Sequence, residues 1–132
     1  MEDFLVEKKI YYHDTDCGGV VYYANYLKYL EEARTEYYSN MGVNLKELME
    51  EGLLFAVVKV EIDYKSPAHY QDTLTIATRI GKIRGSAVQF IQEVRKRDTI
   101  IAAATTMLMC VNSDFKVVPL PDEVKGILSE GV

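Results

Sequence analysis

Residues 11–26 read YYHDTDCGGVVYYANY and are the most informative stretch of the 132-residue chain. They contain a turn with two acids and a glycine pair, Asp14, Asp16, Gly18 and Gly19. Glycine accepts positive φ angles and the close approach of other atoms, so this composition is typical of a loop. The sequence on either side of it differs in periodicity, which predicts a strand before the loop and a helix after it.

The segments that flank the loop carry these two periodicities. Residues 4–12 alternate, with Phe4, Val6, Ile10 and Tyr12 on one parity, which predicts a half-buried strand that ends at Tyr12. Residues 22–41 place apolar side chains at spacings of three and four, starting from Tyr22. This spacing predicts an amphipathic helix with one buried face, ended by Gly42.

The rest of the chain predicts a short helix and then a meander of strands. Asn44 and Glu47 resemble a capping box for the short helix. Strands are expected over residues 56–64, 74–80, 88–94 and 100–111, the last apolar on both parities as in a strand covered on both faces. Their short connections favour antiparallel neighbours. We expect one α+β domain over residues 1–132, in which a five-stranded antiparallel sheet covers one long helix. A short C-terminal helix follows the prolines near residue 120.

Composition narrows the class of protein. Fifteen basic against 20 acidic side chains give a net charge of −5, the wrong sign for binding nucleic acid. The longest uncharged stretch, residues 99–113, is shorter than the roughly 20 residues of a membrane span. The acidic N-terminus does not resemble a signal peptide, and Cys17 and Cys110 suit a reducing compartment. We therefore expect a cytoplasmic protein.

The start of the predicted helix is a candidate site in its own right. A helix start presents unpaired N–H groups and a partial positive charge, which attract an anion or polarise a carbonyl oxygen. No Asp or Glu follows within the first helical turn, whereas the preceding loop carries two carboxylates. The pattern is that of a base next to an oxyanion site.

Residues 14–26, followed by Glu31-Glu32-Ala33-Arg34, resemble the N-terminal signature of the 4-hydroxybenzoyl-CoA thioesterase-like family of hotdog-fold enzymes. They are most similar to the small bacterial acyl-CoA thioesterases associated with the Tol-Pal system. The resemblance implies a hotdog fold and a dimer whose sheets join edge to edge, with each active site at the subunit boundary. It assigns the catalytic carboxylate to Asp16 and the N–H that polarises the thioester carbonyl to Tyr23. Tol-Pal-associated enzymes often have His in place of Tyr23, so their substrate preference is not transferred.

The implied activity is hydrolysis of acyl-CoA or aroyl-CoA thioesters to the free acid and CoA. Asp16 is ionised at neutral pH and acts either as a general base or as the nucleophile, and no metal or organic cofactor is required. An open sheet edge also predicts a homo-oligomer, at least a dimer and preferably a tetramer. The residues expected to bind substrate are Gly19, Tyr22 and Tyr26 near the loop and, for the anionic CoA, Arg79, Lys82, Arg84 and Ser86.

Other interpretations of the same residues remain open. The chain could be a non-catalytic hotdog module that binds acyl thioesters, although such a module has no need of Asp16. A dehydratase would require a catalytic His. Cys17 and His13 could form a nucleophile and base, but neighbours in a loop rarely point together. Asp14 is expected to shape the turn, and Glu31 and Arg34 to form an ion pair on the helix.

Overall fold

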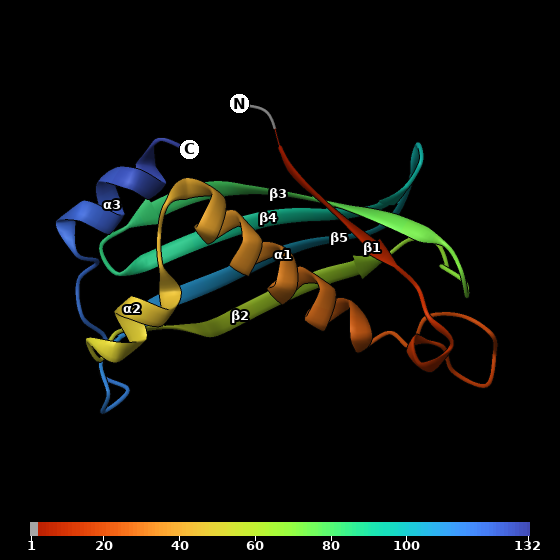
Figure 1. Cartoon of the computed structure of the whole chain (residues 1–132), viewed down its shortest axis with the longest axis horizontal. Helices are drawn as coiled ribbons and strands as arrows, with labels where there is room; N and C mark the ends of the chain where they lie inside the picture. Colours follow the sequence, from red (N-terminus) through yellow and green to blue (C-terminus); the bar gives the residue numbers. More distant parts are fainter. Residues whose placement is uncertain (1–2) are drawn as a thin grey trace.

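The computed structural model describes residues 3–132. Its five strands form one antiparallel sheet in the order β1-β3-β4-β5-β2, and the long helix α1 crosses one face of that sheet (Figure 1). This arrangement confirms the predicted α+β hotdog architecture. The elements are β1 (Phe4–Lys9), a 3₁₀ turn (Tyr12–Asp14), α1 (Asn25–Met41), α2 (Leu45–Glu50), β2 (Leu54–Tyr64), β3 (Thr73–Arg84), β4 (Ala87–Lys96), β5 (Thr99–Val111) and α3 (Asp122–Ser129).

The core lies between α1 and the inner face of the sheet. Tyr29, Leu30 and Ala33 of α1 are buried against Leu74 and Ile76 of β3 and their neighbours. The helix and the strands each carry apolar side chains at the spacing that places them on one face. The packing buries these two apolar faces against each other. The helix ends where predicted, at Gly42 with a left-handed φ of 86°.

Several predicted boundaries were wrong. β1 ends at Lys9 because the chain turns into the 3₁₀ segment, and Tyr12 is 77% exposed. α1 begins at Asn25, three residues late, so Tyr22 precedes the helix and is 46% exposed instead of lying on its buried face. β2 and β3 are not neighbours, since residues 65–72 carry the chain from one edge of the sheet to strands near the other.

The outer face of the sheet also corrects the prediction for β5. Its inner residues are buried, but Ala103, Thr105, Met107 and Met109 on the outer face are only half-buried. The strand is apolar on both parities, yet α1 covers only one of its faces. The prediction from the apolar run, that both faces of β5 are covered, was therefore wrong for the outer face.

β2 forms an open edge of the sheet and contains a bulge. Val57 pairs with Leu108 and Lys59 with Met107, so Val58 has no partner in β5. The extra residue changes which parity faces the helix side. At the two ends of β2, Phe55 and Tyr64 reach Tyr38 and Tyr26 of α1.

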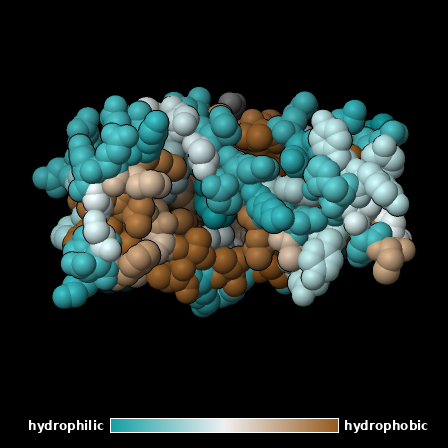
Figure 2. Space-filling view, turned by 60° about the horizontal axis from the view of Figure 1, so that its bottom comes forward, coloured by the Kyte–Doolittle hydropathy of each residue, from teal (hydrophilic) through white to brown (hydrophobic). Residues whose placement is uncertain are grey.

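The middle of β2 is not covered by the helix. Val57, Val58 and Val60 are 48, 55 and 38% exposed. Figure 2 shows the apolar patch to which this edge belongs. An uncovered apolar strand at a sheet edge is a surface on which another chain can pair.

A buried polar network ties α1 to the sheet. Gln92 of β4 is 1% exposed, and its side-chain amide donates to the Leu30 carbonyl and to Thr78 Oγ1, both at 3.0 Å. Gln92 Oε1 accepts from Nη1 of Arg34 at 3.2 Å. The network satisfies buried polar groups at the centre of the core and fixes the helix to strands β3 and β4.

We predict that Gln92→Ala destabilises the protein by about 2–4 kcal/mol, because it leaves Arg34 and Thr78 without their partner and opens a cavity. Urea unfolding measures this loss. Gln89→Ala on the same strand is the matched control, and we expect it to cost less than about 1 kcal/mol because Gln89 is only partly buried. Equal losses for the two variants would contradict the role assigned to the network.

Candidate active site

The acidic loop is closed by its own backbone. Thr15 and Val21 form a bridge, the Asp16 N–H donates to the Val20 carbonyl at 2.9 Å, and the Gly19 N–H donates to the Asp16 carbonyl at 3.0 Å. Gly19 has a φ of 81°, which explains one glycine of the pair. The other is explained by close approach, since a Cβ on Gly18 would lie 3.1 Å from Asp16 Oδ1.

Asp16 stands at the exposed end of this loop. Its Oδ1 accepts a hydrogen bond from the Gly18 N–H at 2.8 Å, which orients the carboxylate. Among the described residues, Asp16 has no cationic partner within 4.0 Å and no other side-chain hydrogen bond. The carboxylate is thus oriented but chemically available.

Asp14 has the structural role that the sequence predicted. It is 6% exposed, and its Oδ2 accepts from the Tyr11 N–H at 2.8 Å. Burial raises the pKa of this carboxyl, but the Tyr11 hydrogen bond, the neighbouring Tyr29 hydroxyl, and the charges of His13 and Lys8 outweigh burial and lower it below its ordinary value. Asp14 is therefore ionised when folded.

The Asp14 backbone joins the loop to the helix start. Its carbonyl accepts from the Tyr22 N–H at 3.0 Å and from Nδ2 of Asn25 at 2.9 Å. Asn25 is the first residue of α1, so these two bonds fix the loop relative to the helix axis. Sequence reasoning missed Asn25, because the helix was predicted to begin at Tyr22, which places Asn25 inside it instead of at its first position.

The helix start leaves a donor for a ligand. The N–H groups of Asn25, Tyr26 and Leu27 donate to carbonyls one turn back, and no side chain caps the helix. Within residues 3–132, the N–H groups of Tyr23 and Ala24 donate no hydrogen bond, and the first turn holds no acidic residue. These features suit an oxyanion donor at the predicted position.

Tyrosine rings surround this donor. The Tyr23 ring lies 5.0 Å from that of Tyr22 and 6.0 Å from that of Tyr64, whose hydroxyl donates to the Tyr23 carbonyl at 3.1 Å. Tyr26 is buried, which raises its pKa to about 12 and keeps the phenol neutral. Sequence reasoning missed Tyr64, which belongs to β2 and is far from the loop in sequence.

A cavity of about 280 Å³ opens next to these rings and the helix start. It is lined by Val20, Val21, Tyr23, Tyr26, Tyr64, Lys65, Ser66 and Pro67. The structure thus brings together the loop, Tyr22, Tyr23 and Tyr26 of the predicted site. It adds the segment that follows β2, which no local motif marked.

The predicted CoA-binding residues lie elsewhere in the same chain. Lys82 and Arg84 are at the end of β3, and Ser86 follows in the hairpin to β4, whereas the acidic loop adjoins the opposite end of the sheet at Thr73. Thr73 and Arg84 are the two ends of β3, and the eleven residue steps between them span about 36 Å. One copy of the chain therefore does not unite the hairpin with Asp16.

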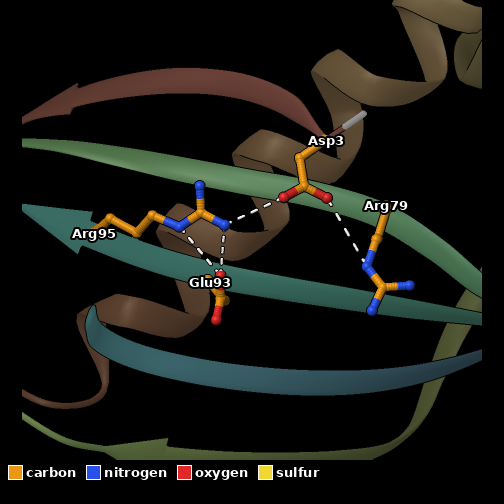
Figure 3. Close-up of polar contacts among 4 residues, drawn as sticks. All are labelled: Asp3, Arg79, Glu93 and Arg95. Carbon is orange, nitrogen blue, oxygen red and sulfur yellow. Dashed lines mark hydrogen bonds and ion pairs between the residues drawn. The ribbon is translucent and has the colours of Figure 1, made fainter. Parts of the chain in front are cut away.

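Arg79 is engaged in an ionic cluster on the outer sheet face. Its Nε lies 3.8 Å from Asp3, which also pairs with Arg95, and Arg95 contacts Glu93 (Figure 3). This cluster ties the residue before β1 to β3 and β4. The helix packs on the other face of the sheet, so Arg79 is remote from the helix start.

The alternative chemistries find little support in the geometry. His13 stacks on Tyr11 and lies 3.8 Å from Asp14, and no contact joins it to the exposed Cys17. The predicted Glu31–Arg34 ion pair is wrong, because Arg34 is buried and bonds to Gln92 instead. Across residues 3–132, no group of three or more His, Cys, Asp and Glu could hold a metal ion. None of the described helices is both long and apolar enough to cross a membrane.

Comparisons with known proteins agree with this architecture. The sequence profile of the Thioesterase-like superfamily matches residues 11–128. Acyl-CoA thioesterase YbgC of Haemophilus influenzae is 39% identical over 125 residues, which cover 93% of this chain and 92% of the relative. Acyl-CoA thioester hydrolase YbgC of an Escherichia coli O6:H1 strain is 38% identical over 105 residues, covering 79% and 78%.

A solved structure gives the same result for the fold. The 1,4-dihydroxy-2-naphthoyl-CoA thioesterase of Synechocystis superposes with a TM-score of 0.88 at 25% identity, over 97% of this chain and 96% of that chain. The chain belongs to the Thioesterase-like superfamily and has its hotdog fold. It is an enzyme that hydrolyses thioesters.

The hydrogen bond from the Tyr11 N–H to the Asp14 carboxylate predicts a pH-dependent contribution to stability. The folded-state pKa of Asp14 is lowered, so its contribution is complete above the unfolded value near 4 and disappears as pH falls through the folded value. Asp14→Asn should lower the free energy of unfolding by about 1–2 kcal/mol at pH 7, and the difference from wild type should shrink at pH 3. Urea unfolding at the two pH values measures both. A difference that grows on acidification would contradict the assigned sign.

Proposed function

We propose that this chain hydrolyses acyl-CoA or aroyl-CoA thioesters, with Asp16 as the catalytic carboxylate and the Tyr23 N–H as the oxyanion donor. The observation that carries the proposal is an oriented carboxylate without a cationic partner, on a closed loop whose backbone is hydrogen-bonded to the helix start, where the Tyr23 N–H is unengaged. The names of the relatives, which are acyl-CoA thioesterases, support CoA as the carrier.

The chemistry needs only these two groups and water. The Tyr23 N–H stabilises the negative charge that develops on the carbonyl oxygen. In one route Asp16 takes a proton from water as the water attacks the carbonyl carbon. In the other, Asp16 attacks and forms an anhydride, which water then opens. In both, the C–S bond breaks, the thiolate leaves and is protonated, and the products are a carboxylic acid and CoA.

Asp16→Asn tests the catalytic assignment. Asn has nearly the same shape but is neither a base nor a nucleophile, so we expect kcat to fall by about 10²–10⁴-fold with little change in KM. Thiol release from a panel of acyl-CoAs measures the effect. Single-turnover reactions in H₂¹⁸O separate the two routes, because only the anhydride route labels the Asp16 carboxylate.

The controls are the two neighbouring side chains. Asp14→Asn and Cys17→Ala should each keep appreciable turnover, since one shapes the loop and the other is an exposed thiol without a base. A folded Asp16→Asn enzyme with near wild-type kcat would overturn the mechanism. Loss of activity in Cys17→Ala would transfer the chemistry to the thiol.

The site is proposed to be completed by a second copy of the chain. The β2 edge exposes Val57, Val58 and Val60, and its outward backbone groups are free to pair with another strand. Antiparallel pairing of two β2 edges gives a closed twofold dimer. Two such dimers would form the tetramer expected from the sequence.

This dimer accounts for the distant basic hairpin. In an antiparallel pairing, the Leu54 end of one β2 lies beside the Tyr64 end of the other, and Tyr64 belongs to the candidate site. The hairpin with Lys82, Arg84 and Ser86 is at the Leu54 end of its own sheet. The hairpin of one copy thus approaches the thioester site of the other, where its charges suit the anionic CoA.

Val60→Lys should separate the subunits, because a charge is placed on the apolar flank of the edge. We expect wild type to sediment as two or more chains of 15.0 kDa, and the variant as a monomer with at least about tenfold lower kcat/KM. Leu5→Lys, on the opposite edge strand at a site that is 56% exposed, is the control and should keep the oligomer. A fully active wild-type monomer would refute the shared site.

We also propose that the protein works in the cytoplasm. Cys17 is exposed and Cys110 is buried, and both are free thiols, a state that a reducing compartment preserves.

A further inference from the structure

A second cavity, of about 340 Å³, lies between α1, α2 and the first residues of β2. It is separate from the cavity at the helix start and shares no lining residue with it. Its walls are mostly apolar, and the apolar patch in Figure 2 belongs to the face that exposes β2. The lining residues are Glu31, Arg34, Thr35, Tyr38, Leu45, Met49, Leu53, Leu54, Phe55, Ala56, Val57, Leu108 and Phe115.

Arg34 places a buried positive charge in this wall. Its side chain is 8% exposed, and its guanidinium makes one side-chain hydrogen bond, to Gln92. Within the described part of the chain, no carboxylate lies within 4.0 Å of it, although Glu31 lines the same cavity. A guanidinium carries five N–H donors, and a buried charge without a counter-ion is costly.

Tyr38, one helical turn further, adds a second unused polar group. It is 2% exposed, and its hydroxyl has no hydrogen-bond partner among the described residues. Its ring stacks on Phe55 at 5.2 Å, and both residues line the cavity. Burial raises the pKa of Tyr38, so the phenol stays neutral and able to donate.

We propose that this cavity binds a carboxylate at the end of a short hydrocarbon or aryl chain. Arg34 offers N–H donors and a positive charge to the carboxylate, and Tyr38 offers a hydroxyl. The chain lies against apolar residues such as Leu45, Met49 and Phe55. An apolar enclosure with a few convergent polar groups is the common form of a small-molecule site.

Two sources could supply this carboxylate. One is a free carboxylic acid, which is also the product of thioester hydrolysis. The other is the far end of an acyl group that is bound as a thioester. The second source rests on the proposed function, because the cavity reaches a thioester only across the paired β2 edges, where residues 54–57 of one copy adjoin the Tyr64 end of its partner.

Direct binding tests the free acid without any turnover. Octanoate and octan-1-ol have chains of equal length, and we expect octanoate to bind wild type at least about tenfold more tightly by calorimetry. Arg34→Met, which keeps an aliphatic stem, should abolish this preference. Tyr38→Phe removes one oxygen atom and should weaken octanoate by roughly threefold or more.

Kinetics test the bound acyl group. We compare kcat/KM for octanoyl-CoA with kcat/KM for the CoA monothioester of octanedioic acid, whose acyl group ends in a carboxylate. The substrate ratio is kcat/KM for the dicarboxylic substrate divided by kcat/KM for octanoyl-CoA. If the cavity holds the acyl end, this ratio should fall at least about tenfold in Arg34→Met. Tyr37→Phe is the matched control, because Tyr37 is a buried neighbour on α1 that does not line the cavity. It should change neither the preference for octanoate over octanol nor the kcat/KM ratio.

The outcomes separate the sources and the proposals. Loss of octanoate binding in the variants with an unchanged substrate ratio identifies a free acid, and a changed ratio identifies the acyl end. The inference is overturned if wild type binds octanoate no more tightly than octanol and the substrate ratio is unchanged in Arg34→Met and Tyr38→Phe, or if neither variant affects octanoate binding or the substrate ratio. Tyr38→Phe keeps the test valid if Arg34→Met fails to fold. Absence of thiol release from every acyl-CoA and aroyl-CoA tested would count against the proposed function alone.

Discussion

The two hydrogen bonds to the Asp14 carbonyl hold the candidate site together. One comes from the Tyr22 backbone before α1 and the other from the side chain of Asn25 in its first turn. Because one donor is the first residue of α1 and the other lies three residues before it, the two bonds attach the acidic loop to the helix start. The Asp16 carboxylate and the Tyr23 N–H, the two groups that we propose act in catalysis, therefore share one support, and such preorganisation favours catalysis.

The same helix leaves part of its sheet uncovered, and this has functional consequences. α1 packs across the core strands, while the middle of β2 keeps its valines exposed. The bulge at Val58 contributes, because it changes which side chains face inward. An exposed apolar surface of this kind is costly in an isolated chain, and the proposed pairing of two β2 edges would cover it.

Local periodicity was sufficient to predict the long helix and the five strands, since each buries one face against the other layer. It failed at β2, where a bulge and the choice of sheet neighbour depend on contacts with β5 that no local pattern encodes. Within the site, the loop and the helix start are contiguous in sequence and were recognised together. Tyr64 comes from a strand 41 residues away from Tyr23, so only the fold reveals it.

Arg34 illustrates how a local interpretation can miss a long-range role. Three residues from Glu31 on a helix, it has the spacing of an ion pair, but its side chain turns inward to Gln92 on β4. Gln92 Oε1 accepts a single hydrogen bond from Arg34, so it satisfies only part of the guanidinium. A wholly apolar core would be easier to build than one with a half-satisfied cation. The position of that cation, between the sheet and a cavity next to the open edge, is explained if its remaining donors serve a ligand.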